Sequence, residues 1–224
     1  MRPPLSELTF DADTHRYAYH GTPLLGVTGV LVAAGLIDTT FFTENGRTEG
    51  DYLHRALALD HEDALDEPTL DLALVPYVAG WRWLKAELGL TPLLWECPVC
   101  DPVAGYAGMF DLVAIAEDRT GAHVLWLLDY KRRKPGPAAD LQLAAYRRAI
   151  VRMPEPDRAD PGELAAWKLI RRPETFIRRG IVTWAANGRP SLNPCDMRTA
   201  ARDEHRFLAA LEVVKCKQEW GLLT

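Results

Sequence analysis

Several features that would assign a protein to a specialised class are missing from this sequence of 224 residues. No apolar run approaches the roughly 18 residues that a membrane-spanning helix needs. The opening stretch MRPPLSELTFDAD contains no apolar signal-peptide core, so a cytoplasmic location is expected. The sequence also lacks a G-x-x-x-x-G-K-[ST] motif, and it therefore offers no phosphate-binding loop of the helicase type.

Cysteine is scarce, with four residues in the chain: Cys97, Cys100, Cys195 and Cys216. Four cysteines in a chain of this length do not suggest a disulfide framework, and a reducing compartment is the default. A chain of 224 residues can bury a sufficient core without such covalent support. We therefore expect free thiols.

An excess of positive charge is also missing, because the formal net charge is −5. The charge is unevenly distributed. Residues 1–130 carry 7 Lys+Arg and 20 Asp+Glu, a balance of −13, whereas residues 131–179 carry 13 and 6, a balance of +7. On charge alone, a solvated basic helix face explains the second segment best, and a positive surface for a polyanion is the alternative.

Hydrophobic spacing and turn residues predict groups of helices and strands along the chain. Pro76 lies inside one helical pattern and should kink or interrupt that helix. Helices are expected at 28–35, 40–60, 69–88, 138–152, 163–171 and 196–220, and strands within 8–20 and at 93–97, 106–116, 124–131, 176–186 and 189–192. This order predicts one α/β domain over residues 1–224, with a central mixed β-sheet flanked by helices.

Two neighbouring predicted strands each carry a carboxylate. Asp111 lies within GMFDLVAIA, and Asp129 ends the apolar run of WLLDYKRRK. Adjacent antiparallel strands can bring these carboxylates within a few ångströms, where they repel each other unless a cation lies between them. A hard divalent cation with oxygen ligands, Mg²⁺ or Mn²⁺, removes this conflict.

Lys131 follows Asp129 by two residues and therefore points to the same face of its strand. Tyr130 points the other way, into the packing, and leaves its backbone carbonyl available to a metal. Beside a metal ion, an ammonium group can hold an attacking water or neutralise charge on a phosphoryl oxygen. A single Asp-x-Lys is more often a structural ion pair at a strand end, so this interpretation depends on further residues.

Polar residues and glycines near these strands supply that support. Glu96 ends the preceding strand, in LLWECPVC. Gln142 and Tyr146 lie four apart on the helix that follows, share one partly buried face, and need polar partners there. Gly105 and Gly108 would let a ligand or backbone approach closely beside the first carboxylate.

Taken in order, Glu96, G-x-x-D at Gly108–Asp111, D-x-K at Asp129–Lys131 and Q-x-x-x-Y at Gln142–Tyr146 resemble the motifs of the PD-(D/E)XK nuclease superfamily. The Q-x-x-x-Y element is similar to that of its RecB-type and phage exonuclease branches. In those branches a histidine on an upstream helix is often a metal ligand, and His54 has the matching position. The resemblance covers roughly residues 50–150 and implies a restriction-endonuclease-like core.

The resemblance also implies a role for each residue. The metal, Mg²⁺ or Mn²⁺, would be held by His54, Asp111, Asp129 and the backbone carbonyl of Tyr130. Glu96 would lie at the edge of the site and Lys131 would position the attacking water. Gln142 and Tyr146 would orient that lysine or contact the DNA backbone. Phosphate contacts, which are independent of sequence, would come from five cations: Arg132, Arg133, Lys134, Arg147 and Arg148.

The implied function is a metal-dependent deoxyribonuclease, with an exonuclease of phage or mobile-element type favoured, acting on DNA in recombination or repair. If a phage encodes it, it would work in the host cytoplasm. By analogy, such enzymes can form oligomeric rings around DNA and can work beside a single-strand-annealing recombinase.

Two alternatives stay open. One is a nuclease of the CRISPR-adaptation type, with an iron–sulfur cluster held by four cysteines. Cys97 and Cys100 lie inside the nuclease core, however, and Cys195 and Cys216 are 21 residues apart, which is not the spacing of such clusters, so a cluster is not expected. The other alternative is a catalytically silent DNA-binding module of the same fold.

Overall fold

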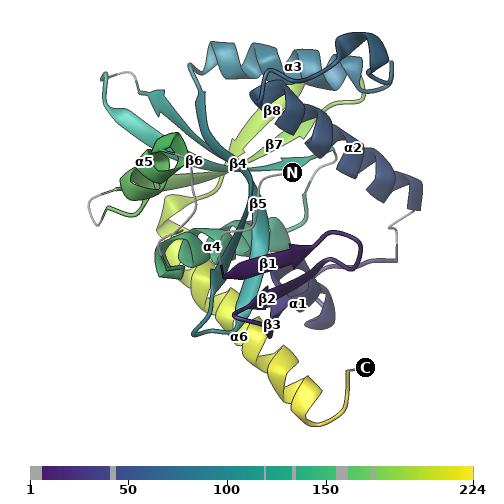
Figure 1. Cartoon of the computed structure of the whole chain (residues 1–224), viewed down its shortest axis with the longest axis vertical. Helices are drawn as coiled ribbons and strands as arrows, with labels where there is room; N and C mark the ends of the chain where they lie inside the picture. The colour runs from purple at the N-terminus through teal and green to yellow at the C-terminus, as the bar shows by residue number, and fades with distance from the viewer. Residues whose placement is uncertain are drawn as a thin grey trace.

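The computed structural model describes residues 7–40, 44–118, 120–132, 135–154, 161–172 and 175–223, and only the backbone of residues 44–47. Its elements follow the predicted order of helices and strands (Figure 1). In chain order they are β1 (Leu8–Asp11), β2 (Arg16–Tyr19), β3 (Thr22–Gly26), α1 (Val27–Ala33), α2 (Glu44–His61), the 3₁₀ turn η1 (Glu67–Thr69), α3 (Val75–Glu87), β4 (Thr91–Asp101), β5 (Tyr106–Glu117), β6 (His123–Lys131), α4 (Ala138–Arg152), α5 (Pro161–Ile170), β7 (Ile177–Trp184), β8 (Pro190–Pro194), the 3₁₀ turn η2 (Met197–Thr199) and α6 (Ala200–Glu219).

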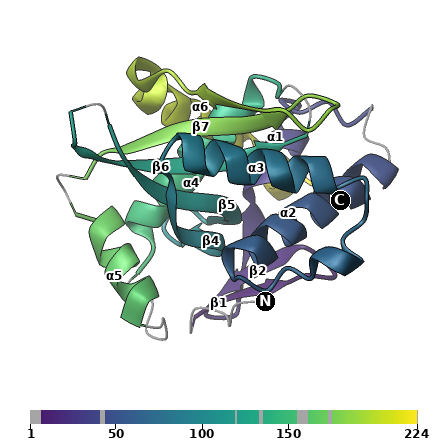
Figure 2. The same ribbon diagram turned by 90° about the horizontal axis from the view of Figure 1, so that it is seen from above.

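In the described part of the chain, eight strands form one mixed sheet with the order β1-β2-β3-β5-β6-β7-β8, and β4 pairs with β5 beside this path. The β3–β5 and β6–β7 pairs are parallel, and the others are antiparallel. Helices cover both faces of the sheet (Figure 2). The larger buried cluster lies under α1, α4, α5 and α6, and the second lies under α2 and α3. The predicted α/β fold class is confirmed.

Strand β3 was not predicted, and several boundaries differ from the sequence-based expectation, among them the start of α6, which lies four residues later than expected. Two further differences involve prolines. The helix predicted at 69–88 begins only at Val75, because Pro76 occupies its first turn, where a missing backbone N–H costs nothing. Strand β4 continues past Cys97 to Asp101, although Pro98 lies within it, because it pairs with β5 along almost its whole length. No helix in the described ranges has the length and apolar character that a bilayer crossing requires.

Strand β5 has a gap on one of its edges. Strand β4 pairs with one edge of β5 from residue 106 to residue 115. The other edge pairs with β3 at Tyr106 and Ala107, and with β6 from Leu112 to Glu117. Between these two pairings, no described strand covers residues 108–111 on this edge. Polar groups at the gap must therefore find partners outside the regular ladder.

Candidate metal centre

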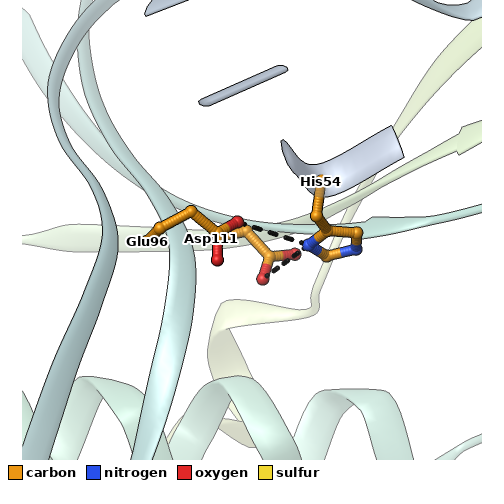
Figure 3. Close-up of side chains that lie close together, drawn as sticks. All are labelled: His54, Glu96 and Asp111. Carbon is orange, nitrogen blue, oxygen red and sulfur yellow. Dashed lines mark hydrogen bonds and ion pairs between the residues drawn. The ribbon is translucent and has the colours of Figure 1, made fainter. Parts of the chain in front are cut away.

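Three side chains from three separate elements meet beside this gap. His54 of α2, Glu96 of β4 and Asp111 of β5 each offer one ligand atom, and these atoms lie within 4.8 Å of one another (Figure 3). The His54 Nδ1 atom is 3.4 Å from both Glu96 Oε1 and Asp111 Oδ1. On the other side of the ring, Nε2 lies 3.3 Å from the backbone carbonyl oxygen of Tyr130. These contacts join α2 to all three central strands.

The position of Glu96 depends on an unusual backbone conformation. The β4–β5 register places Glu96 across from Asp111, between the paired rows Trp95–Leu112 and Cys97–Phe110. Glu96 itself has φ 45°, in the left-handed region that side chains other than glycine rarely adopt. Such a residue costs about 1–3 kcal/mol, and strained residues of this kind cluster at binding and catalytic sites.

Asp111 also satisfies a backbone group where the sheet divides. Its Oδ2 atom accepts a hydrogen bond of 2.5 Å from the backbone N–H of Tyr130. This N–H lies just beyond Leu128, whose pairing with Leu112 is the last between β5 and β6. The carboxylate therefore takes the place of the strand partner that β6 has lost.

Asp129 lies between Leu128 and Tyr130 in β6. It is paired with Lys131, which lies two residues later and therefore on the same face of the strand. Lys131 Nζ lies 3.1 Å from Asp129 Oδ1 with hydrogen-bond geometry, and 2.8 Å from Oδ2 without it. The Oδ2 atom is consequently buried without a hydrogen bond among the described residues. Tyr130 faces the opposite cluster, against α2 and α3.

The charges of these groups are strongly interdependent. Burial disfavours the imidazolium of His54, but the carboxylates of Asp111 and Glu96 outweigh burial and raise its pKa well above the ordinary value. Burial would raise the pKa of Asp111, but His54, Lys131 and the Tyr130 N–H stabilise the carboxylate and lower the pKa below its ordinary value. Burial raises the pKa of Glu96. A protonated His54 thus stands where a metal cation would otherwise neutralise the carboxylates.

Burial raises the pKa of Asp129 to about 6, from an ordinary value of 3.8, with Lys131 opposing the shift. The metal-free folded state therefore holds a proton that the unfolded state has released, so the contribution of Asp129 to stability is full below about pH 4 and is lost as the pH rises through about 6. In EDTA, wild type should lose stability relative to Asp129→Asn between about pH 4 and pH 6, by at most about 1.4 kcal/mol per pH unit, and the difference should level off above about pH 6 to 7. Urea unfolding at several pH values measures this difference, and parallel curves for the two proteins would contradict it.

Gln142 and Tyr146 form a buried pair under the site. The Gln142 side-chain amide donates a hydrogen bond of 2.8 Å to the Tyr146 hydroxyl. A Cβ atom at Gly108 would lie 2.5 Å from the Tyr146 ring, so this glycine makes room for that ring, whereas we expected close approach of a ligand or a backbone. Both side chains are more than 90% buried, which favours an orienting role over contact with a DNA backbone.

The predicted phosphate contacts have different environments. Arg132 pairs with Glu49 and lies over the ring of Tyr77, at 5.0 Å from its centroid. Arg147 is half-buried and has no ion pair among the described residues. Arg133 and Lys134 lie outside the described residues.

Arg148 is engaged by two acidic side chains. Its guanidinium donates hydrogen bonds of 2.8 Å to Asp101, which is fully buried, and of 2.8 Å to Glu204. These contacts tie α4 to β4 and α6. Arg148 therefore links these elements, and its contact with DNA phosphates stays a prediction.

The cysteines do not contribute to the site. Cys97, Cys100 and Cys195 are buried, Cys216 is half-buried, and none of the four forms a disulfide. Within the described ranges, which include all four cysteines, the one group of three or more His, Cys, Asp or Glu side chains with ligand spacing is His54, Glu96 and Asp111.

A divalent cation fits the residues at this site. The group with ligand spacing supplies one imidazole nitrogen and two carboxylates, from His54, Glu96 and Asp111, which are suitable donors for Mn²⁺ or Mg²⁺. Opposite ligands of such an ion lie about 4.2 Å apart, from bonds of about 2.1 Å, and the observed spread of 4.8 Å requires only a small inward shift. The Oδ2 atom of Asp129 accepts no hydrogen bond among the described residues, although Lys131 Nζ lies 2.8 Å away.

Comparison with known proteins gives little further guidance. No protein-family model matches the chain, and no curated protein matches it. Among solved structures, the chain is similar to an alkaline exonuclease from Laribacter hongkongensis, with 11% sequence identity and a TM-score of 0.35, over 88% of this chain and 90% of that one. Similarity at this level supports no inference about activity, which is therefore argued from the residues of the site.

Proposed function

We propose that the protein is a metal-dependent deoxyribonuclease that hydrolyses phosphodiester bonds. One observation carries the proposal: Glu96 and Asp111 from adjacent strands meet His54 with metal-ligand spacing beside the gap in the sheet. Asp129 of the next strand is paired with Lys131 and is close enough to Asp111 and His54 for their charges to affect its pKa. The side chains of His54 and Glu96 are each 28% exposed and that of Lys131 is 34% exposed, so solvent and substrate can reach them.

In this proposal some residues bind the metal, and Lys131 positions the water or the phosphate. His54, Asp111 and Glu96 would hold Mn²⁺ or Mg²⁺. Asp129 and the Tyr130 carbonyl are the further ligands that the motif resemblance adds to this proposal. A metal bound there would make a coordinated water more acidic and stabilise charge on a phosphoryl oxygen. Although burial opposes its charge, Asp129 and Asp111 raise the pKa of Lys131, so the side chain is an ammonium group at neutral pH. Lys131 therefore donates hydrogen bonds to the water or the phosphate oxygen and does not act as the base.

The substrate we propose is DNA, held through its phosphates by Arg132, Arg147 and the neighbouring cations Arg133 and Lys134. The preference for an exonuclease, the phage or mobile-element origin, the role in recombination and repair, and a recombinase partner or oligomeric ring all derive from the motif resemblance. Gln142 and Tyr146 would stabilise the strand end that carries the lysine.

Incubation of linear and circular DNA, with and without 5′-phosphates, in Mg²⁺, Mn²⁺ or EDTA tests the proposal. Linear DNA should be degraded only with metal, and circular DNA should resist an exonuclease. Absence of metal-dependent degradation of every substrate would rule out the nuclease.

The histidine should influence which metal works best. His54 supplies a nitrogen donor, which Mn²⁺ accepts more readily than Mg²⁺ does. We expect faster hydrolysis in Mn²⁺ than in Mg²⁺ at equal concentration, and a smaller difference for His54→Asp, which replaces nitrogen by oxygen. Initial rates over a series of metal concentrations measure both effects. An unchanged Mn²⁺ preference in the variant would remove His54 from the ligand set.

A further inference from the structure

Tyr130 contacts the candidate metal centre through its backbone and a second histidine through its side chain. Its N–H is bonded to Asp111, and its carbonyl oxygen lies 3.3 Å from His54 Nε2. Its hydroxyl lies 3.4 Å from Nε2 of His61, which is also in α2. Every polar group of Tyr130 is thus engaged by a residue of the site or by α2.

We propose that His61 is a positioning residue for the metal centre and acts through the hydroxyl group of Tyr130. The inference rests on the proposed metal site. His54 and His61 are seven residues apart, about two helical turns, so both project from the same side of α2. One helix therefore holds Tyr130 at its backbone and at the far end of its ring.

Aromatic rings enclose this contact. The Tyr130 ring makes edge-to-face contacts with Trp81 at 5.2 Å and Trp184 at 5.8 Å between centroids. It also makes one with His54 at 5.8 Å. His61 in turn packs edge-on against Trp81 at 5.6 Å. Such an enclosure excludes water, so the hydroxyl group has few alternative partners. Its hydrogen bond to His61 is therefore stronger than the same bond would be in water.

The direction of the hydrogen bond follows from the chemistry of the phenol. A tyrosine phenol has an ordinary pKa of about 10, so it is protonated at neutral pH. The hydroxyl therefore keeps its proton and donates to His61 Nε2, which acts as the acceptor. His61 needs no charge for this role.

The consequence for the metal centre is geometric. The ring of Tyr130 cannot rotate or shift while His61 and the tryptophans hold it, so the carbonyl and N–H attached to the same Cα are held in place as well. That carbonyl is a proposed ligand, and that N–H orients the Asp111 carboxylate. Residues that orient metal ligands from behind typically change metal affinity about 10–100-fold.

Mn²⁺ binding, measured by calorimetry or by electron paramagnetic resonance on the full chain, tests the inference without reference to activity. Tyr130→Phe removes only the hydroxyl, and His61→Leu removes only its acceptor. Each should weaken Mn²⁺ binding about ten-fold, and the double variant should lose no more than either single change. His61→Gln, which keeps an acceptor, should restore most of the affinity.

Tyr77→Phe is the matched control, because Tyr77 is buried in the same cluster and its hydroxyl is bonded to Arg132 at 3.4 Å and not to the site. It should bind Mn²⁺ as wild type does. Wild-type affinity in both Tyr130→Phe and His61→Leu, with only a lower melting temperature in EDTA, would make His61 a packing residue and overturn the inference. A wild-type protein that binds no Mn²⁺ would instead refute the metal site itself. If His61→Leu does not fold, the nearly isosteric Tyr130→Phe decides.

Discussion

Lys131→Ala is expected to lower the rate of metal-dependent DNA hydrolysis about 10³-fold, in line with the loss of a group that acts on charge developing in the transition state. Lys131 is an ammonium group held against Asp129 and close enough to Asp111 to alter its pKa. No other described lysine makes an ion pair with a residue of the site. Asp129→Ala should reduce the rate at least as much, because it removes a metal ligand. Single-turnover hydrolysis of a labelled linear duplex measures both.

Lys85→Ala is the matched control for the lysine. Its ammonium group lies 3.6 Å from the buried Asp60, and its side chain is 29% exposed, close to the 34% of Lys131. It therefore reproduces the loss of a lysine beside a buried carboxylate, away from the metal centre. We expect near wild-type hydrolysis. Equal rates for wild type and Lys131→Ala would remove the lysine from the mechanism.

Asp203→Ala is expected to reduce the free energy of unfolding by about 3–5 kcal/mol, the largest effect on stability that we predict. Asp203 of α6 forms a 2.8 Å ion pair with Arg179 of β7, and the two side chains are 5% and 3% exposed. Arg179 also donates to the carbonyl of Asp140. Removing the carboxylate leaves the guanidinium buried without its counter-charge. Urea unfolding in the presence of EDTA measures the loss.

Two further variants serve as controls for Asp203→Ala. Glu212→Ala breaks an exposed ion pair with Lys215 on the same helix and should cost less than about 1 kcal/mol. The double change Arg179→Met with Asp203→Leu removes both charges and should cost less than Asp203→Ala alone. A loss of under 1 kcal/mol for Asp203→Ala would show that the buried pair contributes little.

Local patterns predicted much of the fold. The alanine-rich stretch 138–152 is a helix over the predicted range, and the apolar runs of β5 and β6 are strands to within one residue of their predicted ends. Strand alternation alone put Asp129 and Lys131 on one face, with Tyr130 on the other. These features depend on neighbours within a few residues, where backbone geometry leaves few choices.

Long-range contacts account for the differences. Gly108 makes room for Tyr146, 38 residues later, and no local pattern names that partner. Arg147 and Arg148 are adjacent and were given the same predicted role, yet of the two only Arg148 forms ion pairs with acidic groups of β4 and α6. His61 was not predicted, although its seven-residue spacing from His54 places both on one side of a helix and was a signal available in the sequence.

Local spacing and side-chain chemistry specify the types of element, the α/β class, and the residue types that can hold a metal. That these residues meet depends on contacts between distant elements. The gap on β5 forms because β3 and β6 cover different parts of one edge. Glu96 reaches it through a left-handed backbone conformation, and α2 places His54 beside it and His61 against the Tyr130 hydroxyl. Pairing between strands and docking of a helix are set by the whole buried surface, which no short stretch of sequence specifies.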